Sequence, residues 1–243
     1  WHASLGYHAW QLKDSARNRA NNAFLESFVT AGYTVFAINH RAAPRFRHPA
    51  AVEDGQRAVR FIRHQANRFG IAPDRIGGFG YSSGAHIIAM VGVLDGAGDA
   101  AAADPVERES ASLQSVVAVA TPTNLLSPLG SQLSANAVTS LMGLVVPPWE
   151  GPRSEEYRAY QQASAVHHVT PGDAPMLLIH GDADEEVPFI QAELMRAALA
   201  NARVEVSLLR IHGGTHGNLQ TVDGPDYLTE MVRWHDRHLR RAQ

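Results

Sequence analysis

Apolar positions along this chain follow two alternating patterns, short continuous runs and longer segments with helical spacing. Continuous runs rich in β-forming residues are typical of buried parallel strands, and they predict strands at 33–39, 75–79, 115–120, 175–180 and 204–211. Apolar side chains three or four positions apart predict helices, at 17–31, 50–69, 85–92, 189–200 and 225–241. Strands that alternate with helices in this way indicate right-handed crossovers and a mostly parallel sheet in an α/β fold.

One long segment, residues 122–170, does not follow the alternation because several prolines interrupt its apolar residues. An insertion of this length between two strands usually has a function of its own. We expect a partly helical cap that supplies apolar walls to a substrate pocket, with Leu125, Met142 and Trp149 among them. The alternative is an insertion that packs on the rim and touches no substrate. In either case we expect residues 1–243 to form a single domain.

Composition narrows the possible partners. The chain has 243 residues, of which 45% are hydrophobic and 19% charged, which suits one large α/β domain. Its formal net charge is −3 and no basic stripe is visible, so we expect no nucleic acid partner. No apolar run approaches the roughly 18 residues of a membrane span. The absence of Cys excludes disulfides, zinc–thiolate sites and a thiol nucleophile, and leaves the cellular compartment open.

The strongest chemical signal is Gly80-Tyr81-Ser82-Ser83-Gly84, a G-x-S-x-G sequence between a predicted strand and a predicted helix. So tight a strand-to-helix turn forces its central residue into strained backbone angles. The flanking glycines carry no side chains that would collide there, so the Ser82 hydroxyl is expected to stand clear at the edge of the sheet. Five residues alone are weak evidence, and the acid and base candidates downstream therefore matter.

A serine hydroxyl needs a base to take its proton and a third group to orient that base. Residues 180–188 offer acids directly after a predicted strand. We select Asp184 because its position beyond the strand end allows it to reach back over the sheet edge. The alternative for Asp182 is a turn residue, and for Glu185 and Glu186 it is a solvated helix entry, which the helix dipole favours.

The base candidate is His216, since glycines on both sides of Thr215-His216 make a loop that can lower the imidazole onto Ser82. His212 is expected to cap the preceding strand instead. His86 lies four residues after Ser82 on the same helix, so it points down the side of that helix and is expected to be a packed or rim residue. The chain order Ser, Asp, His is the order of the α/β-hydrolase triad.

No cofactor or metal is expected. His167 and His168 are adjacent, so their side chains diverge, and no carboxylate accompanies them. The oxyanion of a tetrahedral intermediate needs two N–H donors, and the first is expected to be the backbone N–H of Ser83. Ligands of parallel sheets bind beyond the carboxyl ends of the strands, which is where the three triad candidates fall.

Four sequence segments together resemble α/β-hydrolase esterases, from about residue 10 to the C-terminus. The chain is most similar to carboxylesterases related to hormone-sensitive lipase, to bacterial feruloyl and acetylxylan esterases, and to kynurenine formamidases. The segments that carry the resemblance are Asn39-His40-Arg41-Ala42-Ala43-Pro44, Pro73-Asp74-Arg75-Ile76 with Gly80–Gly84 and His86, His180-Gly181 with Asp184 and Val187-Pro188, and Gly213-Gly214-Thr215-His216-Gly217.

The resemblance implies a serine carboxylesterase that hydrolyses short-chain acyl or small aryl esters, a small-molecule substrate, through Ser82, His216 and Asp184. Tyr81, Val187 and Trp10 join the cap residues as expected pocket walls. Two alternatives stay open. One is an amide-cleaving relative, of formamidase or exopeptidase type. The other is a catalytically impaired hydrolase fold that acts as a binding or assembly module.

The sequence departs from the family pattern near its start. Gly6-Tyr7-His8-Ala9-Trp10 stands where the family has His-Gly-Gly-x-Trp, so the second oxyanion donor is expected to be the backbone N–H of His8 or Ala9. We also expect the fold to be N-terminally shortened relative to the family. We expect Trp1–Leu5, or a partner chain, to supply a central strand between 33–39 and 75–81, since a gap there leaves backbone donors unpaired. A bare apolar edge at 33–39 would favour a homodimer.

Overall fold

The computed structural model describes residues 23–127, 129–143 and 154–240. Its centre is a four-stranded parallel sheet in the order β1-β2-β3-β4, so the spatial order of the strands is their order in the chain. The strands are β1 (Gly77–Tyr81), β2 (Ser115–Val119), β3 (Met176–Gly181) and β4 (Val206–Ile211). The predicted α/β class is therefore confirmed, and all four strands end at one edge.

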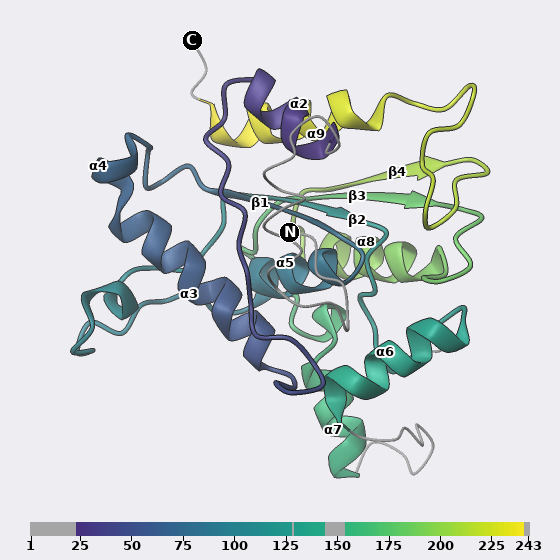
Figure 1. The fold of residues 1–243 in the computed structure, drawn as a ribbon, viewed down its shortest axis with the longest axis horizontal. Coiled ribbons are helices and arrows are strands. Elements are labelled where there is room, and N and C mark those ends of the chain that lie inside the picture. The colour runs from purple at the N-terminus through teal and green to yellow at the C-terminus, as the bar shows by residue number, and fades with distance from the viewer. Residues whose placement is uncertain (1–22, 128, 144–153, 241–243) are drawn as a thin grey trace.

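Helices cover both faces of the sheet (Figure 1). One face carries α2 (Ala23–Thr30) and α9 (Tyr227–Leu239), and the other carries α3 (Ala50–His64), α5 (Ser83–Val93) and α8 (Ile190–Asn201). The helix expected over 50–69 is divided into α3 and the short α4 (Ala66–Phe69). It ends at Gly70, which has φ +65° and closes α4 in the left-handed conformation.

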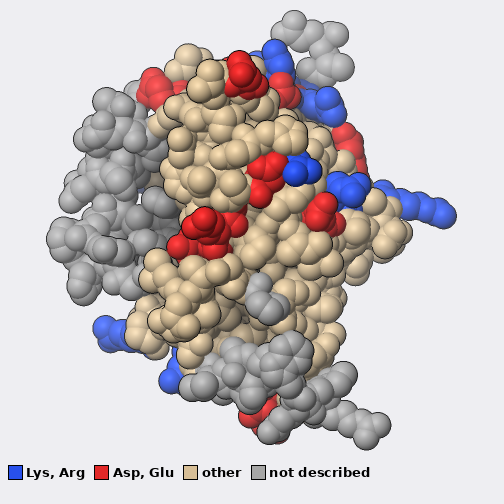
Figure 2. All heavy atoms as spheres, turned by 90° about the vertical axis from the view of Figure 1, so that its right-hand side faces the viewer, with Lys and Arg blue, Asp and Glu red and all other residues tan. Residues whose placement is uncertain are grey.

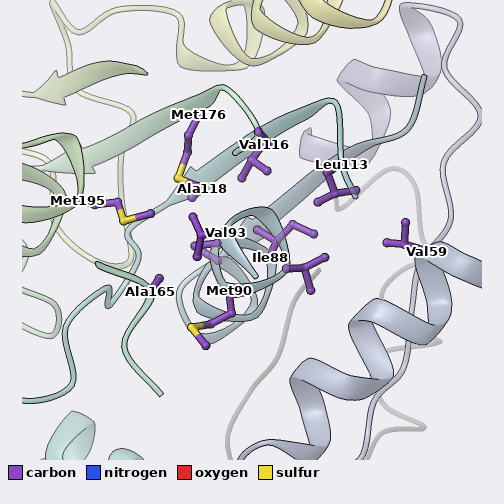
Figure 3. Packing of buried hydrophobic residues seen from close by; sticks show 14 of the residues in the cluster. Val59, Ile88, Met90, Val93, Leu113, Val116, Ala118, Ala165, Met176 and Met195 are labelled. Atoms are coloured by element: carbon purple, nitrogen blue, oxygen red, sulfur yellow. The ribbon is translucent and has the colours of Figure 1, made fainter. Parts of the chain in front are cut away.

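The core follows from this sandwich of layers. Every residue of β2 and β3 is buried because helices lie above and below them. Alternate side chains of β2, such as Val116 and Ala118, pack towards α5, whereas Val117 and Val119 pack towards α9. Figure 3 shows this layer of the core, in which Ile88, Met90 and Val93 of α5 lie beneath the sheet residues Val116, Ala118 and Met176.

The prediction of a strand at 33–39 is wrong, since these residues belong to no strand. A strand needs a hydrogen-bonded neighbour about 4.8 Å away. Here residues 33–39 and β1 instead line a cavity of about 1040 Å³. The apolar run has another cause, because Phe36 and Ile38 pack on the core from the edge. The segment Trp1–Leu5, which we expected to fill this place, lies outside the described residues, so that expectation and the homodimer stay predictions.

In its described residues, the segment between β2 and β3 contains α6 (Gln132–Met142), α7 (Glu155–Gln162) and a short 3-10 turn at Ala165–His167. Another 3-10 turn, at Pro105–Arg108, precedes β2. Leu125 and Met142 are buried in a separate small cluster with Val138, Tyr160 and Ala163. In Figure 1, α6 and α7 stand apart from the sheet, beyond α5 and α8. The described part of the expected cap therefore has its own packing, and its role as a pocket wall stays a prediction.

Candidate active site

Ser82 occupies the turn between β1 and α5 with φ +53° and ψ −123°. A non-glycine residue rarely adopts a positive φ, and such strain concentrates at functional sites. The Ser82 N–H donates to the Val119 carbonyl at the end of β2, with an N–O distance of 2.8 Å. The strained strand-to-helix turn predicted from the sequence is present, and it places the serine at the carboxyl edge of the sheet.

His216 reaches Ser82 from the loop after β4. Its Nε2 lies 2.9 Å from the Ser82 Oγ. The loop is closed by two backbone hydrogen bonds between Thr215 and Asn218, and the ring of Tyr81 lies 5.5 Å from the imidazole, centroid to centroid. The imidazole is thus held against the serine from both its own loop and β1.

Asp184 completes the chain of contacts. Its Oδ2 accepts a hydrogen bond from the His216 Nδ1 at 2.8 Å. Its Oδ1 accepts the backbone N–H groups of Glu186, at 2.9 Å, and Val187, at 2.8 Å. The Asp184 side chain is fully buried. With the proton of His216 on Nδ1, the Nε2 lone pair is free to accept the serine proton.

The charge of Asp184 is maintained in spite of this burial. Burial alone raises the pKa of a carboxyl group, but hydrogen bonds from His180, His216 and the Val187 N–H lower the pKa of Asp184 well below its usual range. His180 is completely buried, and its Nε2 lies 2.8 Å from the Val187 carbonyl and 3.4 Å from the Asp184 Oδ2. This contact was not predicted from the sequence, although the place of His180 at the end of β3, four residues before Asp184, is a signal for it.

The chain resembles known proteins over most of its length. Residues 7–199 match the sequence model of the BD-FAE family. The chain belongs to this family. Esterase LipC of Mycobacterium tuberculosis is 28% identical over 217 residues, which are 80% of this chain and 47% of that protein. A probable isoprenylcysteine alpha-carbonyl methylesterase of Arabidopsis thaliana, ICMEL1, is 23% identical over 76% of this chain and 39% of its own length. The chain spans about half the length of these curated relatives or less.

Solved structures share the fold. A truncated form of a carbohydrate esterase from gut microbiota has a TM-score of 0.80 at 24% identity, over 99% of this chain and 84% of that one. An acetyl ester-xyloside bifunctional hydrolase from Caldicellulosiruptor lactoaceticus has a TM-score of 0.76 at 26% identity, over 87% of this chain and 74% of that one. The described residues therefore have the α/β-hydrolase fold that the resemblance implied.

Of the three expected oxyanion donors, the structure describes one. Ser83 is the first residue of α5, and the N–H groups of a first helical turn have no acceptor within their own helix. The positive end of the helix dipole adds to the attraction for an anion at this place. The other two candidates, His8 and Ala9, lie outside the described residues, as do Trp10 and Trp149 of the expected pocket.

The other acid and base candidates, Asp182, His212 and His86, make contacts that hold the fold together. Asp182 accepts hydrogen bonds from the Gly213 N–H at 2.7 Å, from Arg210 at 2.8 Å and from the His212 Nδ1 at 3.0 Å. It thus joins the ends of β3 and β4, in keeping with the turn role considered for it. His86 is buried, and its Nε2 lies 2.7 Å from the Ala163 carbonyl, so it is a packed residue.

The glutamates after Asp184 and the expected pocket residues differ in their surroundings. Glu185 is exposed, but Glu186 is no solvated helix entry, because its carboxylate accepts hydrogen bonds from the Ser131 and Ser134 hydroxyls at the start of α6. Val187 is buried and contributes its backbone to Asp184, and Tyr81 lines the large cavity beside β1. Whether these side chains, or Leu125 and Met142, touch a substrate stays a prediction.

The face at the carboxyl ends of the strands is shown in Figure 2, where acidic and basic side chains are interspersed among neutral ones. Within the described ranges, no group of three or more His, Asp or Glu side chains is arranged to hold a metal ion. No helix in the same ranges is both long and apolar enough to cross a bilayer.

Proposed function

We propose that the protein is a serine carboxylesterase for short-chain acyl or small aryl esters. The observation that carries the proposal is the continuous hydrogen-bonded chain from the Ser82 Oγ through His216 to the buried, ionised Asp184. The names of the relatives support it, since LipC is an esterase and ICMEL1 a probable methylesterase.

The proposed reaction uses this chain of contacts. The Ser82 Oγ attacks the ester carbonyl while the His216 Nε2, 2.9 Å away, takes its proton. The negative charge of the tetrahedral intermediate lies near the N–H of Ser83 at the start of α5. His216 then returns the proton to the leaving alcohol, and an acyl-enzyme on Ser82 remains. Water, deprotonated by the same imidazole, releases the acid, and Asp184 keeps the imidazole in the required tautomer throughout.

The decisive experiment measures hydrolysis of p-nitrophenyl acetate, butyrate and octanoate by the protein and by Ser82→Ala. We expect activity on the two shorter esters and a loss of about 10⁴-fold or more in kcat for the variant. Covalent labelling by a fluorophosphonate separates an inactive serine from an unsuitable substrate. A folded protein that neither hydrolyses these esters nor reacts with the label at Ser82 would contradict the proposal and favour the impaired, binding-module alternative.

A further inference from the structure

The helix α6 is fastened to the loop that carries Asp184. Ser131 caps the N-terminus of α6, where its hydroxyl accepts the N–H of Ser134 at 3.1 Å. The hydroxyls of Ser131 and Ser134 both donate to the Glu186 carboxylate, the second at 2.6 Å. The backbone adds a third connection, because the Gly130 N–H donates to the Glu186 carbonyl at 3.1 Å.

The other end of α6 is fastened as well. The N–H of His48, in the loop before α3, donates to the carbonyl of Leu141 at 2.9 Å. One end of α6 is thus tied to the Asp184 loop and the other to a loop of the α/β core. In Figure 1 the helix occupies this position beyond α5 and α8, on the same side of the sheet. These hydrogen bonds restrain α6 at both of its ends.

Glu186 contacts both the catalytic acid candidate and α6, through its backbone and its side chain. Its backbone N–H donates to the Asp184 Oδ1 at 2.9 Å, while its side chain accepts from α6. The two hydroxyl donors hold the pKa of Glu186 below its usual range, so the carboxylate is ionised in a neutral assay. A charged acceptor makes stronger hydrogen bonds than a neutral one, and a negative charge at a helix N-terminus is favourable.

We propose that Glu186 is a positioning residue that fixes α6 relative to Ser82 and thereby sets the acyl-chain preference of the enzyme. This inference rests on the proposed esterase function. Within the described residues, the Glu186 side chain makes no hydrogen bond to Ser82, His216 or Asp184, although its charge interacts with those of His216 and Asp184. We assign its effect on substrate preference to the position of α6. Loss of its charge leaves the backbone donor to Asp184 in place, so the acid itself should stay where it is.

The experiment compares Glu186→Gln with Glu185→Gln, which removes the same charge from the exposed neighbouring residue. Kinetic constants for p-nitrophenyl acetate and octanoate are measured for the wild type, both variants, Ser134→Ala and the Glu186→Gln/Ser134→Ala double variant. For Glu186→Gln we expect KM for the acetate to rise about fivefold, while kcat changes less than about twofold, which is the effect of losing one charged hydrogen bond that orders the site. The preference for acetate over octanoate should fall.

Two comparisons decide the outcome. Glu185→Gln should match the wild type, and the double variant should be no worse than Glu186→Gln, since both substitutions break the same connection. A fall in kcat with unchanged KM would place the effect on the triad and overturn the cap role. Equal effects of the two glutamine variants, or additive effects in the double variant, would overturn it too.

A second measurement separates this inference from the proposed function. Denaturant unfolding of the same set of variants tests the contact between Glu186 and Ser134 without any substrate. Non-additive losses of stability in the double variant support the connection, and strictly additive losses contradict it. If the wild type hydrolyses no ester, the esterase proposal fails by its own test, and the unfolding data still report on whether Glu186 holds α6.

Discussion

At the scale of single residues, the site depends on where one proton is held. The Asp184 carboxylate accepts from the His216 Nδ1 and so leaves Nε2 as the acceptor for Ser82. Asp184→Asn replaces that acceptor by an amide that can turn its NH₂ towards Nδ1 and favour the wrong tautomer. We expect kcat for p-nitrophenyl butyrate to fall by about 10⁴-fold with an unchanged circular dichroism spectrum.

A matched control lies two residues earlier. Asp182→Asn is the same chemical change, but Asp182 contacts the ends of β3 and β4 through Arg210 and Gly213 and does not reach His216 in the described contacts. We expect this variant to lose less than about tenfold in kcat and to unfold at a lower denaturant concentration. If the two asparagine variants lost activity equally, the assignment of Asp184 as the orienting acid would be wrong.

At the scale of elements, the position of Ser82 depends on how closely α5 approaches β1. Gly78 and Gly80 lie on the same buried face of β1. A Cβ on Gly80 would lie 2.3 Å from the carbonyl oxygen of Gly84, in the backbone of the first turn of α5, whereas a Cβ on Gly78 would lie 2.4 Å from side-chain atoms of Ile88. Gly80→Ala should therefore distort the turn itself, and esterase activity should fall by at least about 100-fold, because misplacement by 1 Å costs that much.

Gly78→Ala provides the comparison, because Ile88 can adjust its side chain where the backbone at Gly84 cannot. We expect it to lower the free energy of unfolding by about 1–3 kcal/mol, as overpacking does, and to keep most of the activity. Urea unfolding and p-nitrophenyl butyrate assays on both variants give the two readouts. An active Gly80→Ala variant would show that the turn tolerates a side chain at this position.

The elements also show how far the sequence could be interpreted. Strands β1 to β4 and the turn at Ser82 were predictable because each is a local pattern in the sequence. Ser82, Asp184 and His216 each follow the end of a strand, and the carboxyl ends of parallel strands meet at one edge of the sheet. The strand predicted at 33–39 was wrong, because an apolar run looks the same in the sequence whether it pairs in a sheet or packs beside one. The contact of Glu186 with α6 joins residues more than 50 positions apart in segments without periodicity, so no sequence pattern indicated it.

At the scale of the whole molecule, buried histidines make stability depend on pH. Burial lowers the pKa of His235 on α9 to about 3, and burial together with nearby His86 and His168 lowers the pKa of His48 to about 4. Both values are below the ordinary 6.5 that applies in the unfolded chain. The unfolded state therefore binds more protons between about pH 3 and 6.5, so the folded state loses stability as the pH falls through this window.

We expect the free energy of unfolding to fall between pH 7 and pH 5 by about 2 kcal/mol for each of these histidines. Urea titrations at pH 7, 6 and 5 measure this change in the free energy of unfolding.

The variant His235→Phe tests the contribution of one histidine. It removes one titrating group, so its stability should depend less steeply on pH. It also removes the contact of the His235 Nδ1 with the Ser115 hydroxyl at 2.8 Å, so it should be less stable than the wild type at pH 7. An unchanged slope in His235→Phe would show that the loss of stability between pH 7 and pH 5 arises from groups other than His235. Asp184 is not such a group, because its lowered pKa confines its effect on stability to more acidic pH.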